Sequence, residues 1–152
     1  GYDPSGLTTV AKIGAVMEAG FTIPDNTVID SAWDGGEDAI LLVLPAATVN
    51  NYVVIRQTAA ASTGDKDLTI TCGGSDELLE DQIAWIGNHI AAQTDVSADG
   101  DVAITLEVKA GNDGWGAVGS KLVFFCMVEG FWRVKVDSVT TGTGATGTLA
   151  FS

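Results

Sequence analysis

The sequence predicts an all-β protein, an antiparallel β-sandwich or barrel-like domain with an extended N-terminal arm. Residues 122–128 (LVFFCMV) are apolar without a break, as a buried strand would be. After the two-residue connection Glu129-Gly130, residues 131–137 (FWRVKVD) alternate in polarity, which indicates a hairpin. Other short segments with a two-residue period follow residue 39, and clusters of Asn, Gly, Asp and Ser separate them. Short strands at this spacing are typical of a sandwich or barrel.

Residues 1–36 lack this regularity, and we expect them to form the arm. A short helix is possible in residues 7–19, where apolar side chains recur at helical spacing, although Gly14 weakens it. After Gly20 the segment is interrupted by Pro24, Asn26 and Gly35-Gly36, which argues against a core element. An extra edge strand followed by a loop is the alternative.

The arm carries apolar side chains that an interrupted segment cannot bury against itself. We therefore expect them to be buried against another chain. The hairpin adds a tryptophan to this set. The candidate interface residues are Val10, Ile13, Met17, Phe21, Ile23, Trp33 and Trp132.

The β domain is expected to comprise residues 37–152. Its strands before the hairpin are expected at residues 39–44, 52–57, 67–72 and 101–109. The first is apolar at every position, as a strand covered on both faces would be. The last alternates most regularly, and the residues directed inward would be Val102, Ile104, Leu106 and Val108. Residues 78–93 suit a helix or a strand, and the strand is favoured.

The chain is strongly acidic. Seven Lys and Arg oppose twenty Asp and Glu, which gives a net charge of −13. Such a chain repels phosphate backbones, so we expect no nucleic-acid partner. No apolar run approaches the roughly 20 residues that span a bilayer, and no export signal is visible, so we expect no membrane partner and synthesis in the cytoplasm. The acidity serves solubility or matches a basic protein surface.

No motif predicts an enzyme or a cofactor. The G-x-G-x-x-G pattern at Gly142, Gly144 and Gly147 has dinucleotide-site spacing, but neither a helix nor a ribose-binding acid follows it. The lone histidine, His89, cannot form a three-histidine zinc site, and no G-x-S-x-G elbow supplies a nucleophile for a triad. We therefore expect no catalytic residues and no cofactor.

One loop imitates the start of a calcium site. Residues 95–101 place oxygen-bearing side chains at alternate positions, but Leu106 occupies the twelfth position, where a bidentate carboxylate is needed. An ordinary Asp-Gly turn is the favoured interpretation. The alternative is a different kind of calcium site that uses Asp95, Asp99 and Asp101. We expect no metal requirement.

The cysteines and tryptophans are expected to pack. Cys72 and Cys126 lie in apolar strand patterns, which favours free thiols over a bridge between them. The four tryptophans, at positions 33, 85, 115 and 132, are scattered, which favours core or interface packing. On one exposed face they could instead stack against sugars.

Two segments resemble virion-surface modules of tailed bacteriophages. Residues 39–72 contain a strand, an LPAA turn, a strand, a loop and an LTI strand, and residues 123–151 contain an apolar strand, a tight turn, a Trp-bearing strand and a Thr/Gly-rich tail. Similar modules occur in capsid decoration (cement) proteins and in tail fibres. The resemblance implies a non-enzymatic, often oligomeric β domain that binds a capsid shell or a host surface. The chain departs from the pattern at Asn50-Asn51, where Gly is usual, and in residues 95–119, an elaboration of it.

We therefore expect a head decoration protein of the virion that binds the major capsid protein on the outer surface of an assembled capsid. A homotrimer is expected because oligomerisation hides sheet edges. The first alternative is a receptor-binding or tail-fibre module, which would carry a fibrous attachment segment. The second is a carbohydrate-binding or carbohydrate-active β domain, which would gather tryptophans and carboxylates in one cleft.

Overall fold

The computed structural model describes residues 8–13, 20–31, 40–58, 67–86, 93–107, 118–137 and 149–152. The strands are β1 (Thr8–Ile13), β2 (Phe21–Thr22), β3 (Thr27–Ser31), β4 (Ile40–Val43), β5 (Tyr52–Gln57), β6 (Asp67–Thr71), β7 (Glu77–Leu78), β8 (Ile83–Ile86), β9 (Gln93–Val96), β10 (Ala103–Glu107), β11 (Lys121–Val128), β12 (Phe131–Asp137) and β13 (Leu149–Phe151). These described ranges contain strands, turns and irregular segments but no helix. The all-β prediction is confirmed.

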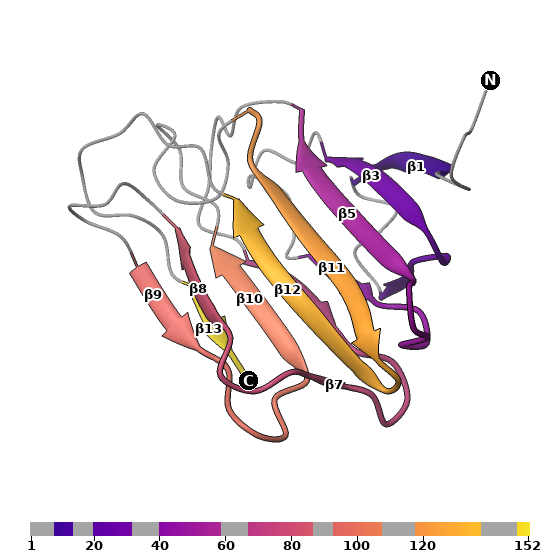
Figure 1. Ribbon diagram of the computed structural model, residues 1–152. Coiled ribbons are helices and arrows are strands. Elements are labelled where there is room, and N and C mark those ends of the chain that lie inside the picture. The colour runs from indigo at the N-terminus through magenta and orange to yellow at the C-terminus, as the bar shows by residue number, and fades with distance from the viewer. Residues whose placement is uncertain are drawn as a thin grey trace.

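Two sheets pack face to face (Figure 1). One has the order β1-β3-β5-β11-β12-β7, the other β13-β10-β6-β4-β2, and β8 and β9 form a small third sheet. A single cluster of buried apolar side chains draws on both large sheets, so the core lies between them. The arrangement is a sandwich and not a closed barrel.

The antiparallel prediction is wrong for half of the topology, because both large sheets are mixed. The first six strands alternate between the layers: β1, β3 and β5 belong to the six-stranded sheet, and β2, β4 and β6 to the five-stranded one. Within each layer these strands run parallel to one another.

The N-terminal arm is also a wrong prediction for the residues that the structure describes. Residues 8–13 are an edge strand and not a helix, in keeping with the β-branched run Thr8-Thr9-Val10, and β3 is an interior strand between β1 and β5. Ile23 and Ile29 belong to the same core cluster as the rest of the domain. The edge-strand alternative is closer to the structure.

The hairpin prediction is confirmed. Strands β11 and β12 pair antiparallel around Glu129 and Gly130, and Gly130 has a φ of 86°, a conformation that glycine adopts without a steric cost. Their inner faces are buried as alternation predicts, through Leu122, Phe124, Cys126, Trp132, Val134 and Val136. The strand preference for the ambiguous region holds for β8.

Two details of the expected burial differ. Leu41 in β4 is 37% exposed, so that strand is covered on one face rather than both. Before β10, the amides of Val102 and Ala103 both donate to the carbonyl of Ser152. Two successive amides that donate to one carbonyl oxygen mark a β-bulge, which changes the alternation of side chains at that point. Val102 is therefore exposed, while Ile104 and Leu106 are buried as predicted.

Candidate functional site

The outer face of the six-stranded sheet combines apolar and basic side chains. Pairing in β11 and β12 sets Phe125 opposite Arg133 and Val123 opposite Lys135. On the other side of β11, Phe125 pairs with Tyr52 of β5. The residues that alternate with them along the strands, such as Phe124 and Val134, are buried in the core. The side chains of the paired residues named above therefore share the outer surface.

This face exposes large apolar groups. Phe125 is 37% exposed, Met127 53% and Val128 50%. The Arg133 Nη1 atom lies 3.8 Å from the Met127 sulfur, which brings a cation against the thioether. Aromatic residues, methionine and arginine are the residue types enriched in protein–protein interfaces. We call this set, Tyr52, Phe125, Met127, Arg133 and Lys135, the outer-face patch.

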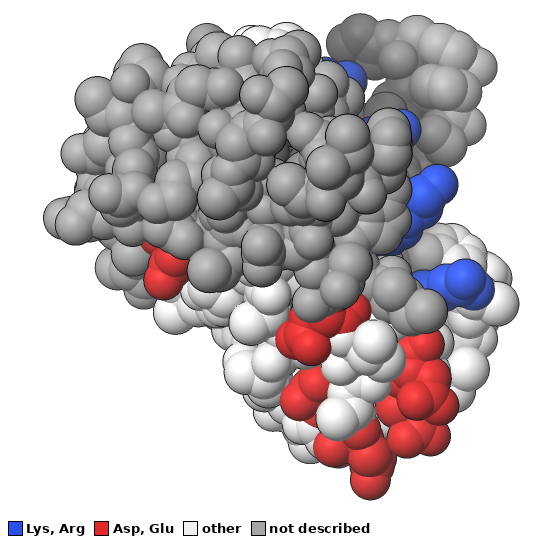
Figure 2. Space-filling model, turned by 90° about the vertical axis from the view of Figure 1, so that its left-hand side faces the viewer, with Lys and Arg blue, Asp and Glu red and all other residues white. Residues whose placement is uncertain are grey.

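Positive charge is concentrated on the same face. Every Lys and Arg whose side chain the structure describes, namely Arg56, Lys121, Arg133 and Lys135, projects from β5, β11 or β12. Acidic side chains gather at a different place, the lower end of the view in Figure 2. Segments that meet near the hairpin turn carry acidic side chains, namely Asp76, Asp99, Asp101 and Glu129 in loops and turns and Glu77 in β7. The molecule is therefore polarised despite its net negative charge.

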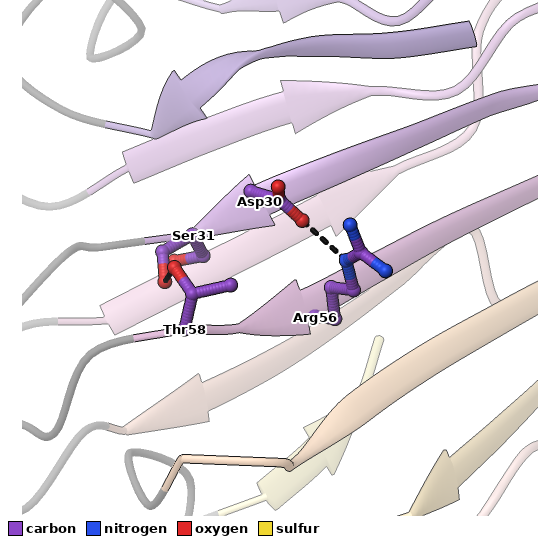
Figure 3. Close-up of polar contacts among 4 residues, drawn as sticks. All are labelled: Asp30, Ser31, Arg56 and Thr58. Carbon is purple, nitrogen blue, oxygen red and sulfur yellow. Dashed lines mark hydrogen bonds and ion pairs between the residues drawn. The ribbon is translucent and has the colours of Figure 1, made fainter.

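Two of the four cations are already paired. Arg56 of β5 forms an ion pair with Asp30 of the neighbouring β3, and the hydrogen bond to Asp30 raises the pKa of Arg56 (Figure 3). The same two strands are joined beyond their ends, where Thr58 donates its amide to the Ser31 carbonyl at 2.8 Å and its hydroxyl at 3.1 Å. Lys121 Nζ lies 3.8 Å from Asp137 Oδ2 across the β11–β12 pair.

The other two cations lack an acidic partner. Among the residues that the structure describes, no carboxylate lies within ion-pair distance of Arg133 or Lys135. Both side chains are exposed. Their charge is available to a partner, because no internal ion pair has to be broken first.

A groove of about 840 Å³ runs along this surface. Its floor is formed by the outer face of β11 and β12, including Phe125, Met127, Arg133 and Lys135. One wall is the segment from Leu79 to Gln82 that follows β7. The groove is an open hollow on the sheet surface, of the size that ligand sites have.

Hydrogen bonds of the Gln82 side chain and of nearby backbone groups hold the wall in place. The Leu79 amide donates to the Trp132 carbonyl at 2.9 Å, and Gln82 Oε1 accepts the Val134 amide at 2.6 Å. Gln82 Nε2 returns a hydrogen bond to the Leu79 carbonyl at 2.6 Å. From the opposite side, the Ser97 hydroxyl donates to the same carbonyl and accepts the Gln82 amide. The amide side chain thus continues the pairing of β12 where β7 ends.

Two of the seven predicted interface residues are buried in the core of this chain. Ile23 and Trp132 are 0% exposed in the core of this chain, and Trp132 Nε1 donates to the Pro45 carbonyl at 3.2 Å, so neither offers surface to a partner or to a sugar. Phe21 is partly buried against the core. Val10 and Ile13 pair with β3 in β1, but their side chains, like Met17 and Trp33 entirely, lie outside the described residues.

Residues 95–101, which resemble the start of a calcium-binding loop, form a hydrogen-bonded turn. Asp101 Oδ2 accepts the Ala98 amide at 2.7 Å, and Asp95 Oδ2 accepts the Phe151 amide at 2.8 Å. Gly100 has a φ of 85°, as an Asp-Gly turn requires. In the described ranges no three His, Cys, Asp or Glu side chains converge on a possible metal position. The G-x-G-x-x-G segment, His89 and Trp115 lie outside those ranges, and of Trp85 only the backbone is described.

Both cysteines are free. Burial raises the pKa of Cys72 to about 12, and the nearby negative charges of Asp76 and Glu77 act in the same direction. Burial also raises the pKa of Cys126, with a further contribution from Glu129. Both thiols therefore stay protonated near neutral pH and are poor nucleophiles.

The outer-face patch was missed because residues 122–128 were interpreted as buried on both sides. The alternation in β12 nevertheless indicated that β11 has a face directed toward solvent. Arg133 and Lys135 alternate with buried residues, so they must face solvent, and antiparallel pairing then requires Phe125 and Val123 to share their face.

Comparisons with protein families, with characterised proteins and with solved structures find no match to this chain. No helix in the described parts of the chain is long and apolar enough to cross a membrane. The resemblance of residues 39–151 to virion-surface modules therefore rests on sequence pattern alone, and function has to be argued from the surface.

Proposed function

We propose that this protein is a structural β module that binds another protein's surface, and that it acts as a capsid decoration protein on the outside of a virion head. The observation that carries the proposal is the outer-face patch. It places exposed apolar groups and unpaired cations on one sheet face of a chain whose net charge is −13. The virion setting comes from the resemblance of residues 39–151 to capsid decoration proteins.

The patch suits adhesion to a protein. Burying the exposed parts of Phe125 and Met127 would contribute roughly 1 kcal/mol or more per side chain at about 25 cal/mol per Å². Association and side-chain ordering oppose this gain, so the apolar contact needs support from charge pairs around it. Arg133 and Lys135 provide that support without breaking an internal ion pair.

Co-sedimentation with capsids tests the proposal. DNA-free capsids of the virus that encodes this chain should pellet the protein and show saturable binding. Phe125→Ser should weaken that binding about tenfold, because it removes an aromatic anchor from the patch. Val96→Ser, which alters an exposed valine of β9 on the small third sheet, is the matched control and should bind normally. Absence of saturable binding by the unaltered protein would contradict the proposal.

We also propose a homotrimer. The six-stranded sheet ends in β1, which at six residues is the longest of the strands at the sheet ends, and an open edge favours association with another chain. Light scattering should give three times the chain mass of 15.6 kDa at micromolar concentration. A monomer under those conditions would remove the trimer from the proposal and leave capsid binding to be judged separately.

A further inference from the structure

We propose that the groove on the outer face of β11 and β12 binds an extended segment of the partner protein that carries both carboxylates and apolar side chains. The inference deepens the proposed function, on which it rests, by naming the chemistry that the patch recognises. Charge complementarity is the argument. Across the described chain, Arg133 and Lys135 are the only cations without an acidic partner, and both line this groove.

The floor presents two stripes side by side. The β11 stripe is apolar, with Val123, Phe125 and Met127, and the β12 stripe holds Arg133 opposite Phe125 and Lys135 opposite Val123. Successive side chains of an extended peptide point in opposite directions. A peptide that alternates apolar and acidic residues can therefore direct its apolar groups toward β11 and its carboxylates toward β12.

The size and rigidity of the groove agree with such an occupant. The floor runs along β11 from Val123 to Met127, so an extended peptide laid along it covers about five or six residues at a similar rise per residue. The wall from Leu79 to Gln82 is held by hydrogen bonds to Trp132, Val134 and Ser97, so little ordering is needed on binding.

The wall also carries the competing charges. Glu80 and Asp81 are exposed beside the groove, and neither forms an ion pair within the described residues. They repel an acidic occupant and compete for the β12 cations. Removing one of these carboxylates should therefore strengthen binding, whereas removing a cation should weaken it. Opposite effects from the two sides of one groove would not arise from a general loss of structure.

The test uses three fluorescein-labelled hexapeptides and the full chain. One peptide alternates glutamate with leucine, one lysine with leucine, and one glutamate with serine. Fluorescence polarisation should show the glutamate–leucine peptide to bind at least tenfold more tightly than either of the others. Arg133→Gln and Lys135→Gln should each weaken that binding about twofold to fivefold, and Glu80→Gln should strengthen it by a similar factor. Arg56→Gln, which removes a cation that is already paired with Asp30, is the control and should leave binding unchanged.

Amide shifts in a ¹⁵N-labelled sample locate the binding site. With the glutamate–leucine peptide, we expect the largest shifts in β11, β12 and the segment from Leu79 to Gln82. Equal binding of the three peptides, or shifts centred on another surface, would overturn the groove assignment. Capsid co-sedimentation separates the two proposals. Capsid binding that survives the Arg133→Gln/Lys135→Gln double substitution refutes the groove alone, and peptide binding without capsid binding refutes the decoration function alone.

Discussion

Gly130 shows how one residue sets the geometry of the outer-face patch. It occupies the β11–β12 turn with a φ of 86°, and its amide donates to the Ala47 carbonyl at 2.9 Å. A Cβ at this position would meet no atom within 4 Å, so any cost of adding one is conformational rather than steric crowding by neighbours. The left-handed conformation costs an alanine about 1–2 kcal/mol.

Gly130→Ala should therefore lower the free energy of unfolding by about 1–2 kcal/mol, as measured by urea denaturation. Gly130→Asn is the matched control, because asparagine tolerates a positive φ better than alanine does, and it should cost clearly less. Equal losses for both variants would show that the turn conformation is not the cause.

Cys72 gives the stability of the fold a specific pH dependence. Its pKa rises from 9.0 to about 12 on folding, chiefly through burial. Between these values the unfolded chain releases the proton while the folded chain keeps it. The stability associated with this thiol is therefore complete below pH 9 and is lost as the pH rises toward 12.

Cys72→Ala should make the free energy of unfolding fall less steeply than in the unaltered protein between pH 9 and about 11. Urea titrations at several pH values measure the difference, and comparison of the two proteins cancels the titration of Lys and Tyr. Parallel pH profiles would show that folding does not raise the pKa of Cys72. A thiol reagent at pH 8 should in addition react slowly with the native protein and fast in urea.

At the scale of elements, the edge of β12 is completed by a side chain. β7 pairs with β12 at only two positions, and beyond them Gln82 accepts the Val134 amide at 2.6 Å and donates to the Leu79 carbonyl. The Gln82 side chain thus gives the Val134 amide a hydrogen-bond acceptor. Without it, this amide could pair with a strand of another chain.

Gln82→Ala should lower the free energy of unfolding by about 1–2 kcal/mol and speed amide exchange at Val134. Gln82→Glu keeps an oxygen that can accept the Val134 amide but loses the donor, so its exchange at Val134 should lie between those of the alanine variant and the unaltered protein. Unchanged exchange in the alanine variant would show that the glutamine does not protect this edge.

The elements also show what the sequence can and cannot reveal. Alternation located β6 and β12 because one face of each is buried, the unbroken apolar run located β11, and the two-residue turn defined the hairpin. The parallel pairing of β3 with β5 and of β4 with β6 left no comparable signal. Each of these pairs joins strands that are separated in the sequence by a strand of the other layer, and such non-local pairing depends on tertiary packing and not on local residue preference.

At the scale of the whole molecule, the charge distribution orients an approaching partner. The described cations lie on the outer face of one sheet, and the acidic loops lie at one end of the sandwich (Figure 2). Within the described residues, the acidic loops repel a partner with acidic groups, and the unpaired cations of the patch attract it. Electrostatic complementarity of this kind contributes more to orientation and association rate than to affinity.

The described strands within residues 1–36, about a quarter of the chain, belong to the fold, and deletion of this stretch provides the most decisive test of the architecture. Removing residues 1–36 eliminates β1, β2 and β3, which opens the six-stranded sheet beside β5. It also removes Ile23 and Ile29, both fully buried, and each buried isoleucine stabilises by roughly 1.5–3 kcal/mol. Their combined contribution of about 3–6 kcal/mol is a large part of the 5–15 kcal/mol that stabilises a typical domain.

The truncated chain should therefore show no cooperative thermal transition by circular dichroism, whereas the exposed-surface variant Val96→Ser should melt like the unaltered protein. A folded, cooperatively melting truncation would mean that residues 37–152 form an independent domain, and the assignment of β3 to the core would then be wrong.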